Sequence, residues 1–298
     1  MERESLLVLL IMLLGGATLQ LFALWPSRVP REGQPAALER RTWIGLWTRV
    51  VPMLFVAAGL LGWALQESDP VRDPLDPGVL LAIWAPFGLV FLRAAARAVW
   101  ALLSRPADCG VSTVGLIQPQ IMFSPFLAKQ LDDGVIRAAL AHERSHARHR
   151  DPLRIWIAQL VTDLQWPWPS AKRRFAVWLD ALELARDDEA RAGGADGADL
   201  AAAVLASVRF LSQLPPQERV RFTATQLAHA RLTGNARALR NRVSRLLSPL
   251  PDLCRDRPRG PGLLNTAGYL LSPLLAAAVM LGLVCGERIV HPLLAATL

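Results

Sequence analysis

Two histidines and a glutamate at fixed spacing are the residues of this chain best suited to chemistry. The segment Val135 to Arg150 reads VIRAALAHERSHARHR and contains His142, Glu143 and His146 in the pattern H-E-x-x-H. Residues four apart share one face of a helix, so both imidazoles can bind one ion. In this pattern the imidazoles typically bind zinc and the glutamate is the general base for a water molecule. We therefore expect His142 and His146 to be metal ligands and Glu143 to be catalytic.

The residues around the motif predict the helix that must carry it. Asp133 is suited to cap its start, and Pro152 lies just beyond its end. Val135 and Ala139 continue the face that carries His142, which indicates that the histidines point inward.

A second predicted helix supplies the remaining ligand. A catalytic zinc ion usually has three protein ligands and one open position. The stretch Trp178 to Arg191, WLDALELARDDEAR, carries Glu183 and Asp187 four residues apart. We expect Glu183 to be the third ligand and Asp187 to orient an imidazole by accepting its N–H. Asp180 and Asp187 remain alternative ligands, Asp188 is an alternative for the orienting role, and a solvated acidic helix face is the alternative to a site.

The composition places these helices in a membrane protein. The chain has 298 residues, of which 52% are hydrophobic and only 19% charged, and its mean hydropathy is +0.28. These values are too apolar for a typical soluble domain and exclude an intrinsically disordered chain. The three cysteines match neither a paired zinc motif nor a disulfide framework.

Four apolar runs predict membrane spans. They cover about residues 6–24, 44–65, 78–92 and 263–285. A crossing needs about 20 apolar residues, so the third run is short by itself. It is counted as a span because the charge distribution requires an odd number of crossings before residue 93.

Basic residues set the predicted orientation. Arginines gather between the first and second runs and again after the third, whereas the connection 66–77 has one arginine and four acidic residues. Residues 93–262 contain 25 lysines and arginines against 16 acidic residues. The positive-inside rule then puts residues 93–262 in the cytoplasm and both termini outside. The sequence has no compact basic patch with interleaved aromatic residues, so direct binding of nucleic acid is not expected.

Three segments follow from these patterns. Residues 1–92 form a membrane domain, residues 93–262 a cytoplasmic zinc-binding domain, and residues 263–298 a fourth span with a short external tail. Strands are expected near 111–116 and 121–123, and further helices at about 199–214 and up to 247, the last one amphipathic and lying under the inner leaflet. Several tryptophans near span ends are expected to anchor the chain at the membrane interface, namely Trp25, Trp43, Trp47, Trp63 and Trp100.

The motif pair resembles a known family. HERSHARHRDPL, residues 142–153, is similar to the H-E-l-a-H-x-r-r-r-D-p-l signature of the BlaR/MecR-type membrane metallopeptidases, and ELARDDEA, residues 183–190, to their E-x-x-C-D-e-x-A segment. GLIQPQIMFSP, residues 115–125, resembles the strand-like stretch before the motif helix. Arg186 stands where the family usually has cysteine.

The resemblance implies a mainly helical, four-span protein of a bacterial-type inner membrane, with a cytoplasmic α+β gluzincin domain between spans three and four. It also implies a zinc endopeptidase that cleaves a cytoplasmic transcriptional repressor. The sequence after the fourth span holds no penicillin-binding domain, so β-lactam sensing is not expected of this chain, and the signal would come from a separate sensor partner, the loop 66–77 or the bilayer. The alternatives are an HtpX-like quality-control protease and a non-catalytic zinc-containing membrane scaffold.

Overall fold

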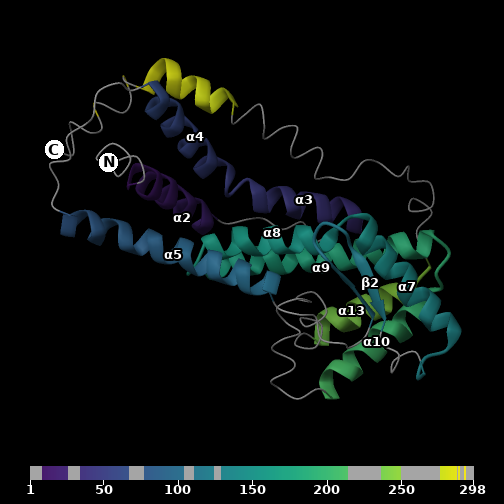
Figure 1. Ribbon diagram of the computed structural model, residues 1–298. Helices are drawn as coiled ribbons and strands as arrows, with labels where there is room; N and C mark the ends of the chain where they lie inside the picture. The colour runs from purple at the N-terminus through teal and green to yellow at the C-terminus, as the bar shows by residue number, and fades with distance from the viewer. Residues whose placement is uncertain are drawn as a thin grey trace.

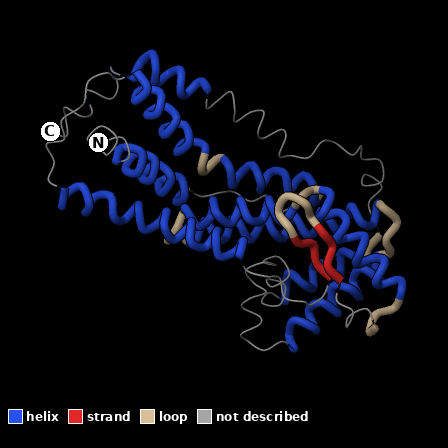
Figure 2. The backbone as a smooth tube through the Cα atoms, in the orientation of Figure 1, coloured by secondary structure: helices blue, strands red, loops and turns tan. Residues whose placement is uncertain are grey.

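The computed structural model is mainly helical (Figures 1 and 2). It describes residues 9–25, 34–66, 77–103, 111–123, 129–213, 236–249 and 276–286, with residues 288 and 292. The helices are η1 Ile11–Gly15, α2 Gly16–Leu24, α3 Pro35–Trp47, α4 Val51–Gln66, α5 Pro77–Leu103, α7 Asp133–Arg148, α8 Asp151–Leu164, α9 Pro169–Ala192, α10 Gly197–Gln213 and α13 Ala236–Leu247. Strands β1 Val111–Val114 and β2 Gln120–Phe123 pair antiparallel, with Val111 opposite Phe123.

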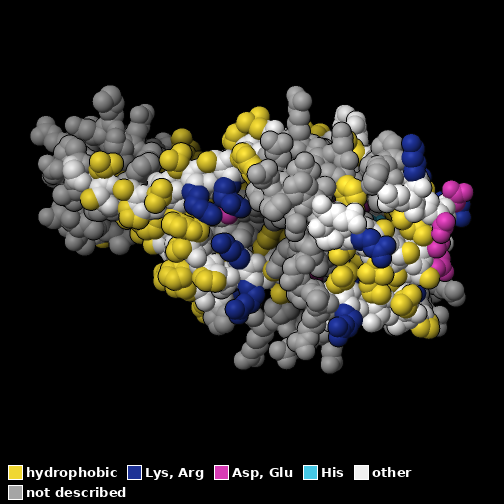
Figure 3. All heavy atoms as spheres, turned by 90° about the horizontal axis from the view of Figure 1, so that it is seen from below, with side chains coloured by type: hydrophobic (Ala, Val, Ile, Leu, Met, Phe, Trp, Pro, Cys, Tyr) yellow, Lys and Arg dark blue, Asp and Glu magenta, His cyan; other side chains and the backbone are white. Residues whose placement is uncertain are grey.

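Apolar helices occupy one end of the molecule. Within the described residues, Pro35–Trp63 and Ala85–Leu103 are long and apolar enough to cross a membrane, and Ile11–Leu24 and Ala276–Gly286 are shorter apolar helices. Figure 3 shows hydrophobic side chains over several parts of one face, with Lys and Arg side chains in its middle and right parts. The mainly helical fold was predicted from the sequence. Residues 67–76 and 263–275, which complete the predicted loop and fourth span, lie outside the described residues.

Helix α3, the first part of the apolar segment Pro35–Trp63, packs chiefly against helix α9. The chain turns at residues 48–50, so α3 and α4 run as two helices with a bend between them (Figure 2). Helix α3 packs along α9 (Figure 1). Their shared core contains Trp43, Leu46, Ala158, Phe175, Trp178, Leu179 and Leu182. The predicted boundary at residue 92 therefore separates segments that pack together.

Burial corrects the interpretation of two tryptophans as interface anchors. Trp43 and Trp63 are each 1% exposed. Trp43 packs against Trp178 with 5.0 Å between ring centroids, because α3 lies on α9, whereas Trp63 on α4 lies against the helix Ala276–Gly286. Trp25 and Trp100 are exposed, as an interface position requires.

A left-handed residue turns the motif helix back on itself. Helix α7 ends at Arg148 and α8 begins at Asp151, with Arg150 between them at φ 52° and ψ 42°. This conformation is uncommon for a residue with a side chain, and it reverses the chain within two residues. The turn brings Asp151 back beside the histidines. The expected cap, Asp133, is instead the first helical residue, after the N-cap Asp132.

Glycines allow helix Ala276–Gly286 to cross α4 at backbone contact. A Cβ atom on Gly62 would lie 2.2 Å from the carbonyl oxygen of Val279, and one on Gly282 would lie 2.1 Å from the carbonyl oxygen of Gly59. Small residues at such crossings are typical of helices that associate in membranes.

The crossing predicts opposite outcomes for two glycines one turn apart. Gly62→Ala should cost about 1–3 kcal/mol of stability, because backbone atoms must move apart to admit the methyl group. Gly59→Ala should be tolerated, since its Cβ would lie 3.8 Å from the nearest oxygen. Thermal unfolding of both variants in detergent checks this; equal melting temperatures would contradict the packing.

Candidate metal centre

The motif histidines lie on the buried face of α7. His142 and His146 are each 5% exposed, and Val135 and Ala139 on the same helix are also buried, as the sequence predicts. The two imidazole rings lie 4.7 Å apart between centroids, and their Nε2 atoms are 3.0 Å apart. Spacing of four residues on one helix therefore does bring two ring nitrogens to the same point.

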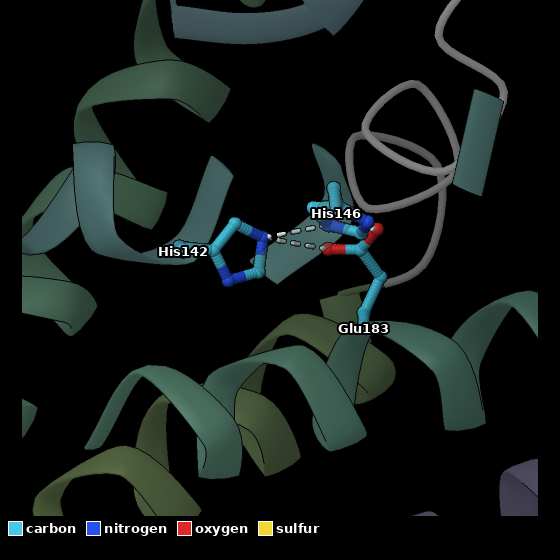
Figure 4. A group of neighbouring side chains, drawn as sticks. All are labelled: His142, His146 and Glu183. Carbon is cyan, nitrogen blue, oxygen red and sulfur yellow. Dashed lines mark hydrogen bonds and ion pairs between the residues drawn. The ribbon is translucent and has the colours of Figure 1, made fainter. Parts of the chain in front are cut away.

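Helix α9 brings Glu183 to that point (Figure 4). Its Oε2 lies 3.5 Å from Nε2 of His142, and its Oε1 lies 3.6 Å from Nε2 of His146. Glu183 is 3% exposed, and the three donor atoms lie within 4.8 Å of one another. Donors of a tetrahedral zinc ion at about 2.0–2.1 Å lie about 3.3 Å apart, so this set fits such an ion. Asp180, the alternative ligand, is exposed and does not belong to this group.

A carboxylate contacts Nδ1 of each histidine, on the side of the ring away from Nε2. Oδ1 of Asp187 lies 2.9 Å from Nδ1 of His142, and Oδ2 of Asp151 lies 2.8 Å from Nδ1 of His146. A carboxylate on Nδ1 fixes the ring orientation and leaves Nε2 for a metal. The sequence predicts Asp187 for this role but gives no sign of Asp151, because the approach of Asp151 depends on the left-handed turn at Arg150. Asp188, the alternative to Asp187, pairs instead with Arg245.

A buried arginine from α13 completes the group. Nη1 of Arg242 lies 2.8 Å from Oε2 of Glu183, and its Nε and Nη2 donate to both oxygens of Asp187 at 2.6 and 2.8 Å. Arg242 is only 3% exposed. The sequence predicts that this helix lies under the inner leaflet. That prediction is wrong for Arg242, because α13 packs on α9 and α10 through Leu246.

The electrostatics of the group favour positive charge at the donor atoms. Burial by itself lowers the pKa of His142, but hydrogen bonds and charge from Asp187 and Glu183 outweigh it and raise the pKa to about 10. Burial raises the pKa of Asp187, yet Arg242 and His142 together lower it to about 2. A cation that binds here therefore replaces a proton on His142, which is the usual linkage at metal sites.

The predicted general base has a partner from the sheet. The hydroxyl of Thr113 on β1 donates to Oε2 of Glu143 at 2.7 Å and also lies 2.9 Å from the backbone oxygen of Glu143. Glu143 is 3% exposed and follows His142 on the same turn of α7. The expected strands at 111–116 and 121–123 are present as β1 and β2, and β1 holds this carboxylate against the helix.

Within the described residues, the remaining histidine, His149, lies apart from the group. His149 pairs with Glu189 at 2.8 Å near the surface. His229, the other residue considered for transition-state stabilisation, lies outside the described residues.

Comparisons of the chain with family models, curated proteins and solved structures found no match. The geometry of the group must therefore carry the functional argument.

Buried charge predicts that Arg242 is needed for folding stability. Arg242→Met should lower the free energy of unfolding by about 3–5 kcal/mol, because it removes the arginine that pairs with the buried carboxylates of Glu183 and Asp187. Arg245→Met, a change to the next arginine along the same helix, is the control. The side chain of Arg245 is 32% exposed, so its loss should cost about 1 kcal/mol or less. Chemical denaturation of metal-free protein in detergent checks this, and equal losses would contradict the assigned role.

Proposed function

We propose that this chain is an integral-membrane zinc endopeptidase whose active site faces the cytoplasm. The observation that carries the proposal is the convergence of His142, His146 and Glu183, each buried, with Glu143 next to His142 on helix α7. A structural zinc site needs four protein ligands and has no use for a general base. Three ligands with a neighbouring, oriented carboxylate are instead typical of hydrolytic centres.

The residues would divide the reaction between them. A zinc ion bound here would supply Lewis acidity to a water molecule and to the scissile carbonyl. Glu143 takes the proton of the attacking water and delivers it to the departing amine. The hydroxyl of Thr113 holds Oε2 of Glu143 and so fixes the direction of the carboxylate. Asp187 and Asp151 keep the two imidazoles aimed at the ion.

The small sheet beside the motif helix suggests how substrate is held. Strand β1 contacts α7 through Thr113, and an extended peptide that pairs with β1 would pass close to Glu143. Backbone pairing of this kind suits a protein or peptide substrate better than a small molecule.

The membrane placement rests on the sequence pattern together with the apolar helices. In a chain with four spans and both termini outside, the arginine-rich segment that contains the metal centre lies on the cytoplasmic side of the membrane. The two long apolar helices and the two shorter ones are consistent with membrane insertion, whereas the orientation rests on the distribution of arginine in the sequence. The likeness to BlaR/MecR-type peptidases favours a cytoplasmic transcriptional repressor as substrate and a separate sensor protein as the source of the signal.

A paired measurement of zinc content and cleavage tests the proposal. Wild type and Glu143→Gln should each bind one zinc ion, and cleavage should fall at least about 100-fold in Glu143→Gln because proton transfer is lost. Glu183→Gln should lose or weaken zinc binding. Glu189→Gln, a change on the same helix at a surface pair, is the matched control and should keep both properties.

Two results would contradict the proposal in different ways. Zinc bound by wild type with no cleavage of added cytoplasmic proteins under any activating condition would leave a zinc-containing scaffold. Wild type without zinc would remove the metal centre itself.

The Thr113 contact gives a separate kinetic prediction. Thr113→Val should lower kcat by about 10- to 100-fold, the usual value of a hydrogen bond to a charged group, while zinc content stays at wild-type level. Thr113→Ser keeps the hydroxyl and should keep most of the activity. Equal activity in the valine and serine variants would show that the contact has no part in the reaction.

A further inference from the structure

A buried carboxylate on α3 is joined to the metal centre although it lies outside the motif helices. Glu39 is 5% exposed and forms an ion pair with Nη2 of Arg154, 115 residues further along the chain. The indole N–H of Trp178 also donates to its Oε1 at 3.3 Å. These contacts cross the interface between α3 and the two helices α8 and α9.

Arg154 links Glu39 to Asp151, which contacts the metal ligand His146. Its Nη1 donates to Oδ1 of Asp151 at 2.9 Å, and Oδ2 of Asp151 accepts from Nδ1 of His146 at 2.8 Å. Glu39, Arg154, Asp151 and His146 thus form one continuous polar chain, which we call the α3 relay. Every member of the α3 relay is at least nine-tenths buried, so water does not screen it.

Aromatic rings fix the middle of the α3 relay. The guanidinium of Arg154 lies 4.7 Å from the ring centroid of Trp43 and 5.7 Å from that of Trp178. Trp43 is itself on α3, one turn after Glu39. Helix α3 therefore contributes both the carboxylate that pairs with Arg154 and one of the rings against which it rests.

We propose that Glu39 is a positioning residue through which α3 controls the affinity of the metal centre. If Glu39 moves away, Asp151 is the remaining carboxylate partner of Arg154 among the described residues. The ion pair between Arg154 and Asp151 then changes, and with it the hydrogen bond between Asp151 and Nδ1 of His146. Helix α3 continues through one bend into the apolar helix α4. A shift of α3 therefore reaches His146 through the successive contacts of Glu39, Arg154 and Asp151. The inference rests on the proposed zinc function and adds its regulation.

Zinc affinity measured by chelator competition, on full-length protein in detergent, tests the α3 relay. Glu39→Gln keeps the shape of the side chain and removes its charge. We expect it to weaken zinc binding about 10-fold, within the usual range for residues behind metal ligands. The control is Asp163→Asn, another buried carboxylate on α8 that pairs across elements with Arg93 and Arg97 but does not contact the ligands. Its zinc affinity should stay within about twofold of wild type.

A double-mutant comparison separates positioning from general damage to the fold. If Glu39 acts through Arg154, the variant Glu39→Gln/Arg154→Met should bind zinc no more weakly than Arg154→Met alone. This double variant removes both buried charges together, so it remains informative if Glu39→Gln alone fails to fold. Additive losses would overturn the α3 relay.

The coupling between zinc binding and the docking of α3 can also be measured without an activity assay. If α3 controls zinc affinity, zinc must stabilise the docking of α3 by the same factor. Zinc should therefore slow hydrogen exchange of the α3 amides in wild type and have a smaller effect in Glu39→Gln. Wild-type zinc affinity in Glu39→Gln would overturn the relay and leave the peptidase proposal intact, whereas a wild-type protein that binds no zinc would overturn both.

Discussion

Neutralisation of buried negative charge is the constraint on which the rest of the structure depends. Glu183, Asp187 and Asp151 lie within the helical core, where an unpaired carboxylate costs several kcal/mol. Each of them pairs with an arginine. Arg242 forms ion pairs with Glu183 and Asp187, and Arg154 and Arg186 form ion pairs with Asp151. Burial raises the pKa of Asp151, but the Arg186 guanidinium and His146 bring it well below its usual range. Asp187 and Asp151 therefore stay ionised and can hold His142 and His146 in place.

This charge pattern explains why helices distant in sequence pack together. Helix α13 is strongly basic, yet it buries Arg242 beside Asp187 on α9. Helix α3 has an apolar face of tryptophan and leucine, and it also inserts Glu39 beside Arg154. Apolar burial supplies most of the stabilisation in such interfaces, whereas the charged contacts fix which residues meet. The interfaces thus orient the metal ligands as a consequence of folding.

Local spacing was enough to predict part of the site. His142 and His146, like Glu183 and Asp187, lie four residues apart on helices, so their common face follows from helix geometry alone. Asp151, Arg242 and Glu39 could not be found in this way. Asp151 depends on one left-handed residue, and Arg242 and Glu39 reach the site across 55 and 115 residues of sequence. Hydropathy also misplaced Trp43, because an apolar residue near a span end suits an interface and a protein core equally well.

Zinc X-ray absorption on the purified protein, loaded with one equivalent of zinc, tests the central claim most directly. The account predicts a first shell of nitrogen and oxygen alone at about 2.0–2.2 Å, with the multiple scattering of two imidazoles. It further predicts that one imidazole is lost in His146→Ala. A sulfur ligand in the first shell, or zinc without imidazole scattering, would contradict the assignment of His142, His146 and Glu183 as the metal centre.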